Sequence, residues 1–335
     1  MITMDTGLDP ALLQRPPFTL GKGTTKKIGK EIAAVFTELE KNLPHAMDVW
    51  VEVAKIVGLD KQSPYYLAGL KLARSLDNDL GTGLAGQYHF KPHFIRTVLS
   101  AAHLIQRWHA DPIKPRLGPV LIGKILFASL GHDYFYDIGG NSFPFRLERI
   151  AFKNLIPFLT PFLKTEKEEQ RITRKDIRDI GVMIFATEAS VALKVGSFIQ
   201  AVYARHFGHG PLPSAPKELG RLNRLVKESE LALGAVFVRT ADTFPSTCLT
   251  YAYTRGQSLL VAKEIGIPLK TSADIANFIS RFFENVLNNH VLAPAEFYRD
   301  NTNAIIRSAQ RIIDGVITPH RRRFKPEIQR AHLGR

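Results

Sequence analysis

The sequence predicts an all-α protein built as a single compact multi-helix domain. Apolar residues recur at spacings of three and four along most of the chain, which is the pattern of one buried helix face. We find no pair of alternating strands joined by a two-residue hairpin turn. The chain has 335 residues, of which 45% are hydrophobic, and this length is enough to bury a large core.

The predicted helices follow one another along the chain and are separated by proline- and glycine-containing breaks. The first, residues 24–42, places Ile28, Ile32, Phe36 and Leu39 on one face. The same periodicity continues in residues 64–76, 93–108, 118–130, 176–207 and 272–287. The strongly charged run 164–178 is expected to be a solvated helix or loop.

Three regions are expected along the chain. Residues 1–24 form an N-terminal arm, residues 25–318 the helical domain, and residues 319–335 a basic C-terminal tail. The tail includes the run "HRRRFKPEIQRAHLGR". Such a run is typical of a solvated terminus, and a contact with nucleic acid is the less favoured interpretation.

The charge balance limits the classes of partner. The chain carries 45 Lys and Arg against 31 Asp and Glu, a net charge of +14, which attracts nucleic acid, membrane surfaces or phosphorylated small molecules. The single cysteine, Cys248, excludes an intramolecular disulfide framework and a cysteine-based zinc site. The start of the chain does not resemble a secretory signal, and no apolar stretch approaches the ~18 residues of a membrane span. We therefore expect a cytoplasmic protein without a membrane span.

The stretch "FASLGHDYFYDIGGNSF", residues 127–143, places His132 and Asp133 after an apolar run. One interpretation is a helix end whose polar residues cap and turn the chain. The other is a metal site, because imidazole nitrogen and carboxylate oxygen can bind one cation together. The second interpretation requires further ligands elsewhere in the chain.

Candidate ligands lie on both sides of this pair. His89 and His93 are four residues apart and would share a helix face. Pro92 between them is tolerated only in a first turn, so the helix is predicted to begin near Tyr88 or His89. Asp242 follows a second apolar run, and a carboxylate buried there would need a cation.

The order of these residues resembles the HD superfamily of metal-dependent phosphohydrolases. More narrowly, the sequence is similar to the catalytic domain of 3′,5′-cyclic nucleotide phosphodiesterases over about residues 85–290. That family has a YH-x3-H-x3-V element, an HD pair followed by a glycine-containing loop, an ATD-x-S element and an ADLSNP-like segment. The similar elements here are Tyr88, His89 and His93, with Val98 one residue beyond the expected valine; His132, Asp133 and Asn141; "FATEAS"; "ADTFPS"; and the late helix "ANFISRFFENV".

The resemblance implies a two-metal site and a role for each residue. His93, His132, Asp133 and Asp242 would hold the first metal, Zn, Fe or Mn, and Asp133 would bridge to a second, Mg or Mn. His89 would be the general acid, so His89 and Asp133 are the catalytic candidates. The residues expected to support the metals or face the substrate are Tyr136, Asn141, Glu188, Phe278 and Phe282. Two cations can activate water and clamp a phosphate, and histidine is a suitable proton donor for a leaving alkoxide.

Three positions depart from the family pattern. Tyr136 stands where the family has a third histidine, and Glu188 stands for an aspartate. Ile275 occupies the place of a purine-binding glutamine, for which Asn277, Gln257 or Asn285 could substitute. The leading interpretation is a divergent cyclic nucleotide phosphodiesterase acting on a phosphorylated small molecule, most naturally a nucleotide. A hydrolase of another phosphoester and an inactive metal- or phosphate-binding sensor remain alternatives.

Overall fold

The computed structural model describes residues 24–78, 88–135, 142–165, 171–189, 191–208, 210–211, 213–286 and 293–315. These residues form helices and connecting segments without a strand, which confirms the all-α prediction. The α-helices are α2 (Thr25–Asn42), α3 (Ala46–Ile56), α4 (Pro64–Asp77), α5 (Lys91–Ala110), α6 (Pro119–Gly131), α7 (Arg146–Leu159), α8 (Arg174–Phe185), α9 (Ala192–Phe207), α10 (Ser229–Thr247), α11 (Tyr251–Glu264), α12 (Ser272–Val286) and α13 (Arg299–Ile313). Short 3-10 helices are η1 (Thr160–Lys164), η3 (Lys217–Val226) and η4 (Ala293–Tyr298). The predicted arm, except for Thr24, and the whole of the predicted tail lie outside the described residues.

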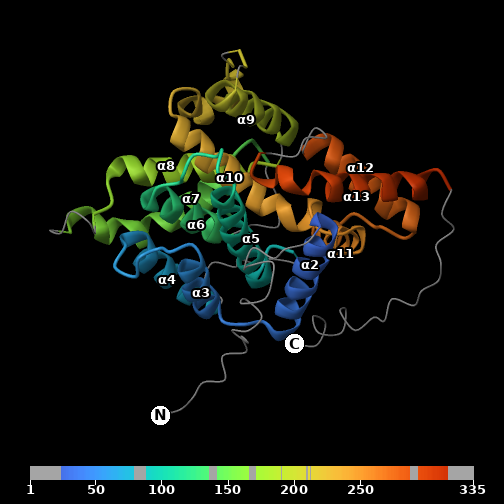
Figure 1. The fold of residues 1–335 in the computed structure, drawn as a ribbon, viewed down its shortest axis with the longest axis horizontal. Coiled ribbons are helices and arrows are strands. Elements are labelled where there is room, and N and C mark those ends of the chain that lie inside the picture. The colour runs from blue at the N-terminus through green and yellow to red at the C-terminus, as the bar shows by residue number, and fades with distance from the viewer. Residues whose placement is uncertain are drawn as a thin grey trace, which may run out of the picture.

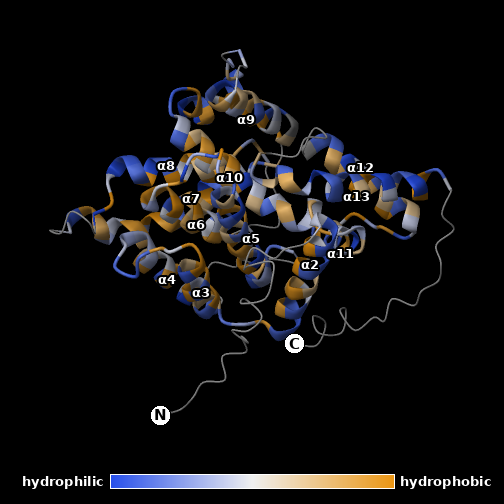
Figure 2. Cartoon of the chain, viewed as in Figure 1, coloured by the Kyte–Doolittle hydropathy of each residue, from blue (hydrophilic) through white to orange (hydrophobic). Residues whose placement is uncertain are grey.

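Three helices form the centre of the molecule. α5, α6 and α10 pack against one another, and the remaining helices surround them (Figure 1). α6 is buried along its whole length from Leu121 to Gly131, and α10 from Leu231 to Ala241. Helices that are apolar on all sides must be enclosed by other elements, which explains their central position. Orange apolar residues accordingly cover these inner helices (Figure 2).

The outer helices are amphipathic. The predicted apolar face of α2 is buried through Ile28, Ile32, Phe36 and Leu39. α12 and α13 pack on each other through a separate apolar cluster that includes Ile275, Ile279, Phe283, Ile305 and Ala309. The polar and charged residues of these helices lie on the faces opposite the apolar ones, as expected for surface helices.

The structure changes two helix boundaries and places Asp242. α5 begins at Lys91 rather than at Tyr88 or His89, because Pro92 takes one of its first two positions. The second apolar run belongs to α10, which contains Asp242 and continues to Thr247. The continuous helical pattern of residues 176–207 is divided into α8 and α9.

The charged run 164–178 is only partly solvated. Its described residues include the start of α8, where Ile177 is buried. The Lys124 ammonium of α6 lies 2.5 Å from an Asp176 carboxylate oxygen and 2.8 Å from one of Asp179. Asp176 of this run and the adjacent Asp179 therefore neutralise the buried Lys124.

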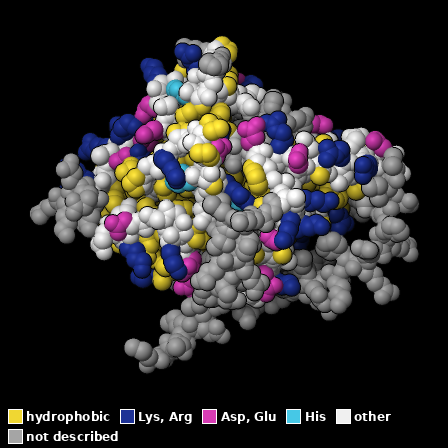
Figure 3. Space-filling model, in the orientation of Figure 1, with side chains coloured by type: hydrophobic (Ala, Val, Ile, Leu, Met, Phe, Trp, Pro, Cys, Tyr) yellow, Lys and Arg dark blue, Asp and Glu magenta, His cyan; other side chains and the backbone are white. Residues whose placement is uncertain are grey.

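The visible surface mixes both signs of charge. On the face shown in Figure 3, Lys and Arg side chains are interspersed with Asp and Glu. None of the described helices combines the length and the apolar character that crossing a membrane requires.

Two helical glycines provide a matched test of the packing. A Cβ added at Gly69 would lie 2.0 Å from the Trp50 ring, which is fully buried and cannot withdraw easily. We expect Gly69→Ala to lower the free energy of unfolding by about 1–3 kcal/mol. Gly256 has nothing within 4 Å of such an atom. Gly256→Ala should instead raise it by about 0.5–1 kcal/mol, because alanine favours helix. Urea unfolding measures both, and equal stability of the two variants would contradict this packing.

Candidate metal centre and its cavity

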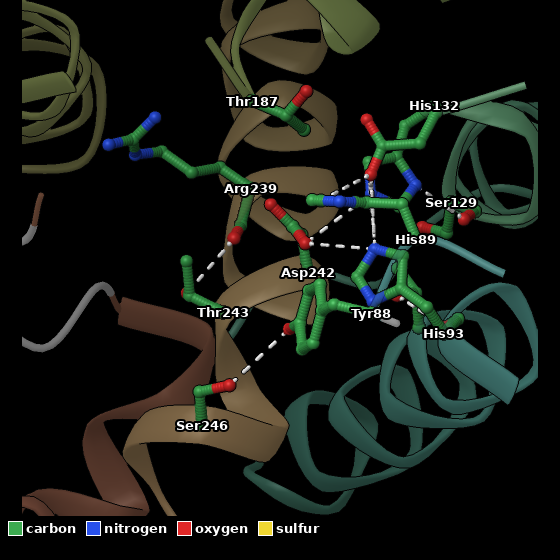
Figure 4. A network of polar contacts seen from close by, with 12 residues as sticks. Tyr88, His89, His93, Ser129, His132, Thr187, Arg239, Asp242, Thr243 and Ser246 are labelled. Carbon is green, nitrogen blue, oxygen red and sulfur yellow. Dashed lines mark hydrogen bonds and ion pairs between the residues drawn. The ribbon is translucent and has the colours of Figure 1, made fainter. Parts of the chain in front are cut away.

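The three central helices bring four ligand-type side chains to one point. His93 lies in the first turn of α5, His132 and Asp133 directly follow α6, and Asp242 lies in α10. Figure 4 shows the Asp242 carboxylate directed toward the histidine rings. One ligand atom from each of the four residues lies within 4.8 Å of the others. The structure therefore brings together every residue that the sequence predicted for the first metal.

The spacing of these atoms suits a common cation. His93 Nε2 lies 3.1 Å from His132 Nε2 and 3.1 Å from Asp133 Oδ2. His132 Nε2 lies 3.0 Å from Asp133 Oδ2 and 3.3 Å from Asp242 Oδ1. Ligands about 2.1 Å from one metal and at right angles to each other lie about 3.0 Å apart. The four atoms could therefore occupy neighbouring positions around one divalent ion.

A backbone carbonyl directs the His132 ring toward this point. His132 Nδ1 lies 3.1 Å from the carbonyl oxygen of Ser129. Nδ1 donates its proton there, which leaves the lone pair of Nε2 facing His93 and the two carboxylates. Histidines that bind metals are commonly fixed in this way, so the donor set fits a metal on chemical grounds as well as on distance.

The electrostatics of the protein alone show how strongly the site favours positive charge. Burial would lower the pKa of His132, but the Asp133 and Asp242 carboxylates raise it well above its ordinary value. Burial lowers the pKa of His93 to about 4. Burial would raise the pKa of Asp133, whereas His132 and His89 lower it well below its ordinary value. Two ionised carboxylates beside a neutral imidazole form an attractive position for a cation.

His89 lies beside the ligands and is held by a carboxylate that sequence reasoning missed. His89 Nε2 lies 3.6 Å from Asp133 Oδ2, while Nδ1 forms a short contact with Glu264 Oε1. Glu264 Oε2 accepts hydrogen bonds from the backbone N–H groups of Tyr88, at 2.8 Å, and of His89, at 3.0 Å. Burial would raise the pKa of Glu264, but its bonds to His89 lower it. Glu264 at the end of α11 thus fixes the segment that precedes α5. No motif in the sequence marks this residue.

A cavity of about 400 Å³ opens beside the cluster. Tyr88, His89, Asp133 and Asp242 line its metal end. The apolar part of the lining includes Val261 of α11, Ile265 directly after it, and Phe278, Ile279 and Phe282 of α12, while Thr254, Gln257 and Ser258 of α11 add polar groups. The two phenylalanines predicted to face the substrate, Phe278 and Phe282, are therefore in the lining. Ile275 is buried in the cluster between α12 and α13 and offers no polar atom, as its residue type predicts.

The other predicted supporting residues are placed differently. Tyr136 and Asn141 lie outside the described residues. Glu188 is fully buried between α8 and α9, and its Oε2 accepts a hydrogen bond from the N–H of Phe145. Glu188 therefore anchors the start of α7, where Phe145 has a positive φ of 65°.

Arg239 and Glu148 also line the cavity, and sequence reasoning missed both. Figure 4 shows the Arg239 side chain extending away from the histidines. Its guanidinium donates to the carbonyl oxygens of Ala186, at 2.8 Å, and Ala192, at 3.3 Å. Burial lowers the pKa of Arg239 to about 10, so the group stays cationic at neutral pH and offsets the buried acids. A charged residue inside the apolar run of α10 was the available signal.

Comparisons with known proteins show a shared fold. No protein-family model matches the sequence, and no curated protein has a similar sequence. The phosphodiesterase domain of a RhoPDE fusion protein from the choanoflagellate Salpingoeca rosetta is 13% identical, with a TM-score of 0.50 over 92% of this chain and 98% of that chain. A phosphodiesterase domain of Salpingoeca rosetta rhodopsin phosphodiesterase is 13% identical, with a TM-score of 0.51 over 93% and 96%. LmjPDEB1 in complex with IBMX is 13% identical, with a TM-score of 0.51 over 85% and 87%. The chain thus has the fold of phosphodiesterase domains.

Asp133 is central to the donor set, because its Oδ2 faces both ligand histidines. We expect Asp133→Ala to abolish binding of metal, including any second ion that shares this carboxylate. Elemental analysis of protein equilibrated with Mn²⁺ or Zn²⁺ and then desalted measures the loss. Asp60→Ala, an exposed aspartate outside the cluster, is the control and should retain the wild-type content. A variant at Asp133 that keeps its full metal content would contradict the assignment.

Proposed function

We propose that this protein is a metal-dependent phosphoester hydrolase, and specifically a divergent 3′,5′-cyclic nucleotide phosphodiesterase. The observation that carries the proposal is the convergence of His93, His132, Asp133 and Asp242 at one end of a cavity large enough for a nucleotide. The phosphodiesterase-like fold supports the same activity.

The donor set favours particular metals. Two imidazoles and two carboxylates without a thiolate suit Zn²⁺, Fe²⁺ or Mn²⁺ at the first position. Asp133 would also hold a second ion, for which Mg²⁺ or Mn²⁺ would be suitable. Bound there, such ions supply an activated water and neutralise the charge of the phosphoryl oxygens. Asp133 and Asp242 line the cavity, so metals held by their carboxylates would face a substrate bound there.

His89 is the proposed general acid. Its Nδ1 is engaged by Glu264, so Nε2 is the nitrogen that remains on the side of Asp133 and the cavity. A proton carried on Nε2 could pass to the leaving oxygen of a phosphoester that lies against Asp133. Glu264 keeps the ring in this orientation and is therefore a positioning residue.

A nucleotide fits the rest of the cavity. Phe278 and Phe282 of α12 are part of the cavity lining, and flat aromatic rings are suitable contacts for a planar base. One of the similar structures, LmjPDEB1, was solved with IBMX bound. The phosphate would then lie at the charged end and the base between the apolar side chains.

A substrate screen tests the proposal directly. Purified protein is incubated with cyclic and linear nucleotides and with bis(p-nitrophenyl) phosphate, each with Mn²⁺, Mg²⁺, Zn²⁺ or Fe²⁺. We expect metal-dependent hydrolysis of a 3′,5′-cyclic nucleotide to the nucleoside monophosphate. Hydrolysis of linear substrates alone would support a different phosphoesterase. Metal-dependent binding without hydrolysis of any substrate would support a sensor.

We expect His89→Ala to lower kcat by about 10²–10⁴-fold, the range typical of a lost general acid, while metal content stays at the wild-type level. Glu264→Gln should cause a smaller loss, because the ring keeps a hydrogen-bond partner but loses the negative charge beside it. Kinetics and elemental analysis on the same samples test both. Wild-type turnover in His89→Ala, or loss of its metal, would contradict the assigned role.

Tyr136 favours the second candidate, a hydrolase of another phosphoester. The phenol stands where the related enzymes have a histidine, so the second metal or the reaction can differ. If the cyclic nucleotide reaction lacks only this histidine, Tyr136→His should raise cyclic nucleotide turnover or tighten the second metal. Tyr136→Phe should do neither. Loss of all activity in Tyr136→Phe would give the phenol its own role in a different reaction.

A further inference from the structure

Five basic side chains on the outer side of α7 and α8 have no acidic partner among the described residues. All five are exposed, and they are Arg149 and Lys153 of α7 and Arg171, Arg174 and Arg178 at the start of α8 or just before it. None of them forms an ion pair with another described residue. We call this set the α7–α8 basic face. Cations gathered without counter-charges create a positive potential that attracts polyanions.

The acidic residues of the same two helices do not offset this charge. Glu148 of α7 is buried and belongs to the lining of the metal-site cavity. Asp176 and Asp179 of α8 are bound to the buried Lys124 ammonium. Residues 166–170, outside the described residues, add three glutamates against one lysine, a net charge of −2. The five cations of the face exceed that charge.

α7 and α8 lie side by side as an antiparallel pair (Figure 1). Near the start of α8, the N–H of Ile172 donates to the carbonyl oxygen of Phe162, which follows α7, at 3.0 Å. Further along α8, the ring of Phe185 lies 6.0 Å from that of Phe152 in the middle of α7, centroid to centroid. A Cβ at Gly181 would lie 2.8 Å from the same Phe152 ring. The beginning of one helix is therefore beside the end of the other.

The helical repeat places the basic residues of both helices on the same side of this pair. Phe152 and Gly181 mark where the two helices face each other. A helix turns about 100° per residue, so Arg149 and Lys153 lie about 60–100° around α7 from Phe152. By the same count, Arg178 lies about 60° around α8 from Gly181. Equal senses of rotation on two antiparallel helices lead to the same side, so the face consists of two neighbouring rows.

The composition of this face favours the phosphates of a nucleic acid duplex. Four of its five members are arginine, whose planar guanidinium binds phosphate through two parallel hydrogen bonds. Among the described residues of α7 and α8, no large apolar side chain is exposed. The face therefore lacks the apolar side chains with which a peripheral helix enters a bilayer, and the aromatic rings on which unpaired bases stack. A duplex, which presents its phosphates on the outside, requires neither.

We propose that the α7–α8 basic face binds the phosphate backbone of a double-stranded nucleic acid without sequence preference. Each side chain that neutralises a phosphate releases condensed counterions, and this release drives the binding. No member of the face lines the metal-site cavity, so the binding requires neither the metals nor the proposed hydrolysis.

Fluorescence anisotropy of a labelled DNA duplex tests the proposal. The full chain is used in the presence of EDTA, so that metal-dependent contacts do not contribute. If four side chains contact phosphates, the affinity should fall by about 10²-fold as the salt concentration rises from about 50 to 200 mM. A duplex of unrelated sequence should bind with similar affinity.

The test variant replaces four members of the face with glutamine: Arg149→Gln, Lys153→Gln, Arg174→Gln and Arg178→Gln. We expect the slope of log K against log salt concentration to become shallower by about 3–4, and the affinity at low salt to fall at least about 10-fold. The control variant removes the same charge from exposed lysines of α2 and the α3–α4 connection: Lys26→Gln, Lys30→Gln, Lys41→Gln and Lys61→Gln. It should retain the wild-type slope.

Thermal unfolding checks that both variants keep the wild-type fold. If the fourfold variant does not fold, the double variant Lys153→Gln/Arg178→Gln should show about half of its change in slope. Absence of duplex binding in the wild type, or equal slopes in the test and control variants, would overturn the proposal. Loss of binding only in Arg321→Gln/Arg322→Gln/Arg323→Gln would also overturn it, because the C-terminal basic run would then be the site.

Sedimentation with phosphatidylcholine vesicles, with and without phosphatidylserine, separates a nucleic acid from a membrane surface. We expect no binding to either kind of vesicle that depends on the α7–α8 basic face. Binding to the anionic vesicles that the test variant loses, without binding of the duplex, would identify a membrane surface as the partner and contradict the proposal.

Discussion

The close packing of α5, α6 and α10 is the constraint on which the site depends. His93, His132 and Asp242 come from these three helices or their ends, so their mutual distances are set by how closely the helices approach. Glycine permits close approach at this centre: a Cβ at Gly234 of α10 would lie 3.1 Å from Leu121 of α6 and 2.3 Å from Met183 of the neighbouring α8. Glycine in a helix loses more conformational entropy on folding than alanine does, but here it allows the helices to approach closely enough to position the ligands.

Around this centre, single carboxylates tie distant segments of the chain to the cavity. Glu264 closes the end of α11 onto the segment before α5 and sets the His89 ring. Glu40 connects α2 with Arg96 of α5 and Gln257 of α11. Each carboxylate is largely buried, and several hydrogen-bond donors offset the free-energy cost of removing its charge from water. Glu264 therefore fixes His89 at the cavity, and Glu40 fixes Gln257, another residue of its lining.

Sequence reasoning predicted the helical fold from local periodicity, whereas the set of first-metal ligands came from the resemblance of the residue order to a known family. Helical periodicity marks the core faces, and His132–Asp133 stands out after an apolar run. Glu264 and Glu40 left no such signal, since their roles arise from contacts across 175 and 217 positions of the chain. Helix boundaries were missed where the chain breaks between α8 and α9 and where α5 begins at Lys91, with Pro92 in its first turn. Periodicity does not encode either effect.

Crystallography of the protein grown with Mn²⁺ or Zn²⁺, with anomalous data collected at the metal absorption edge, tests the central claim most directly. The account predicts an anomalous peak about 2.0–2.2 Å from His93 Nε2, His132 Nε2, Asp133 Oδ2 and Asp242 Oδ1. A saturating metal that binds elsewhere, with these four side chains linked only to one another, would contradict it.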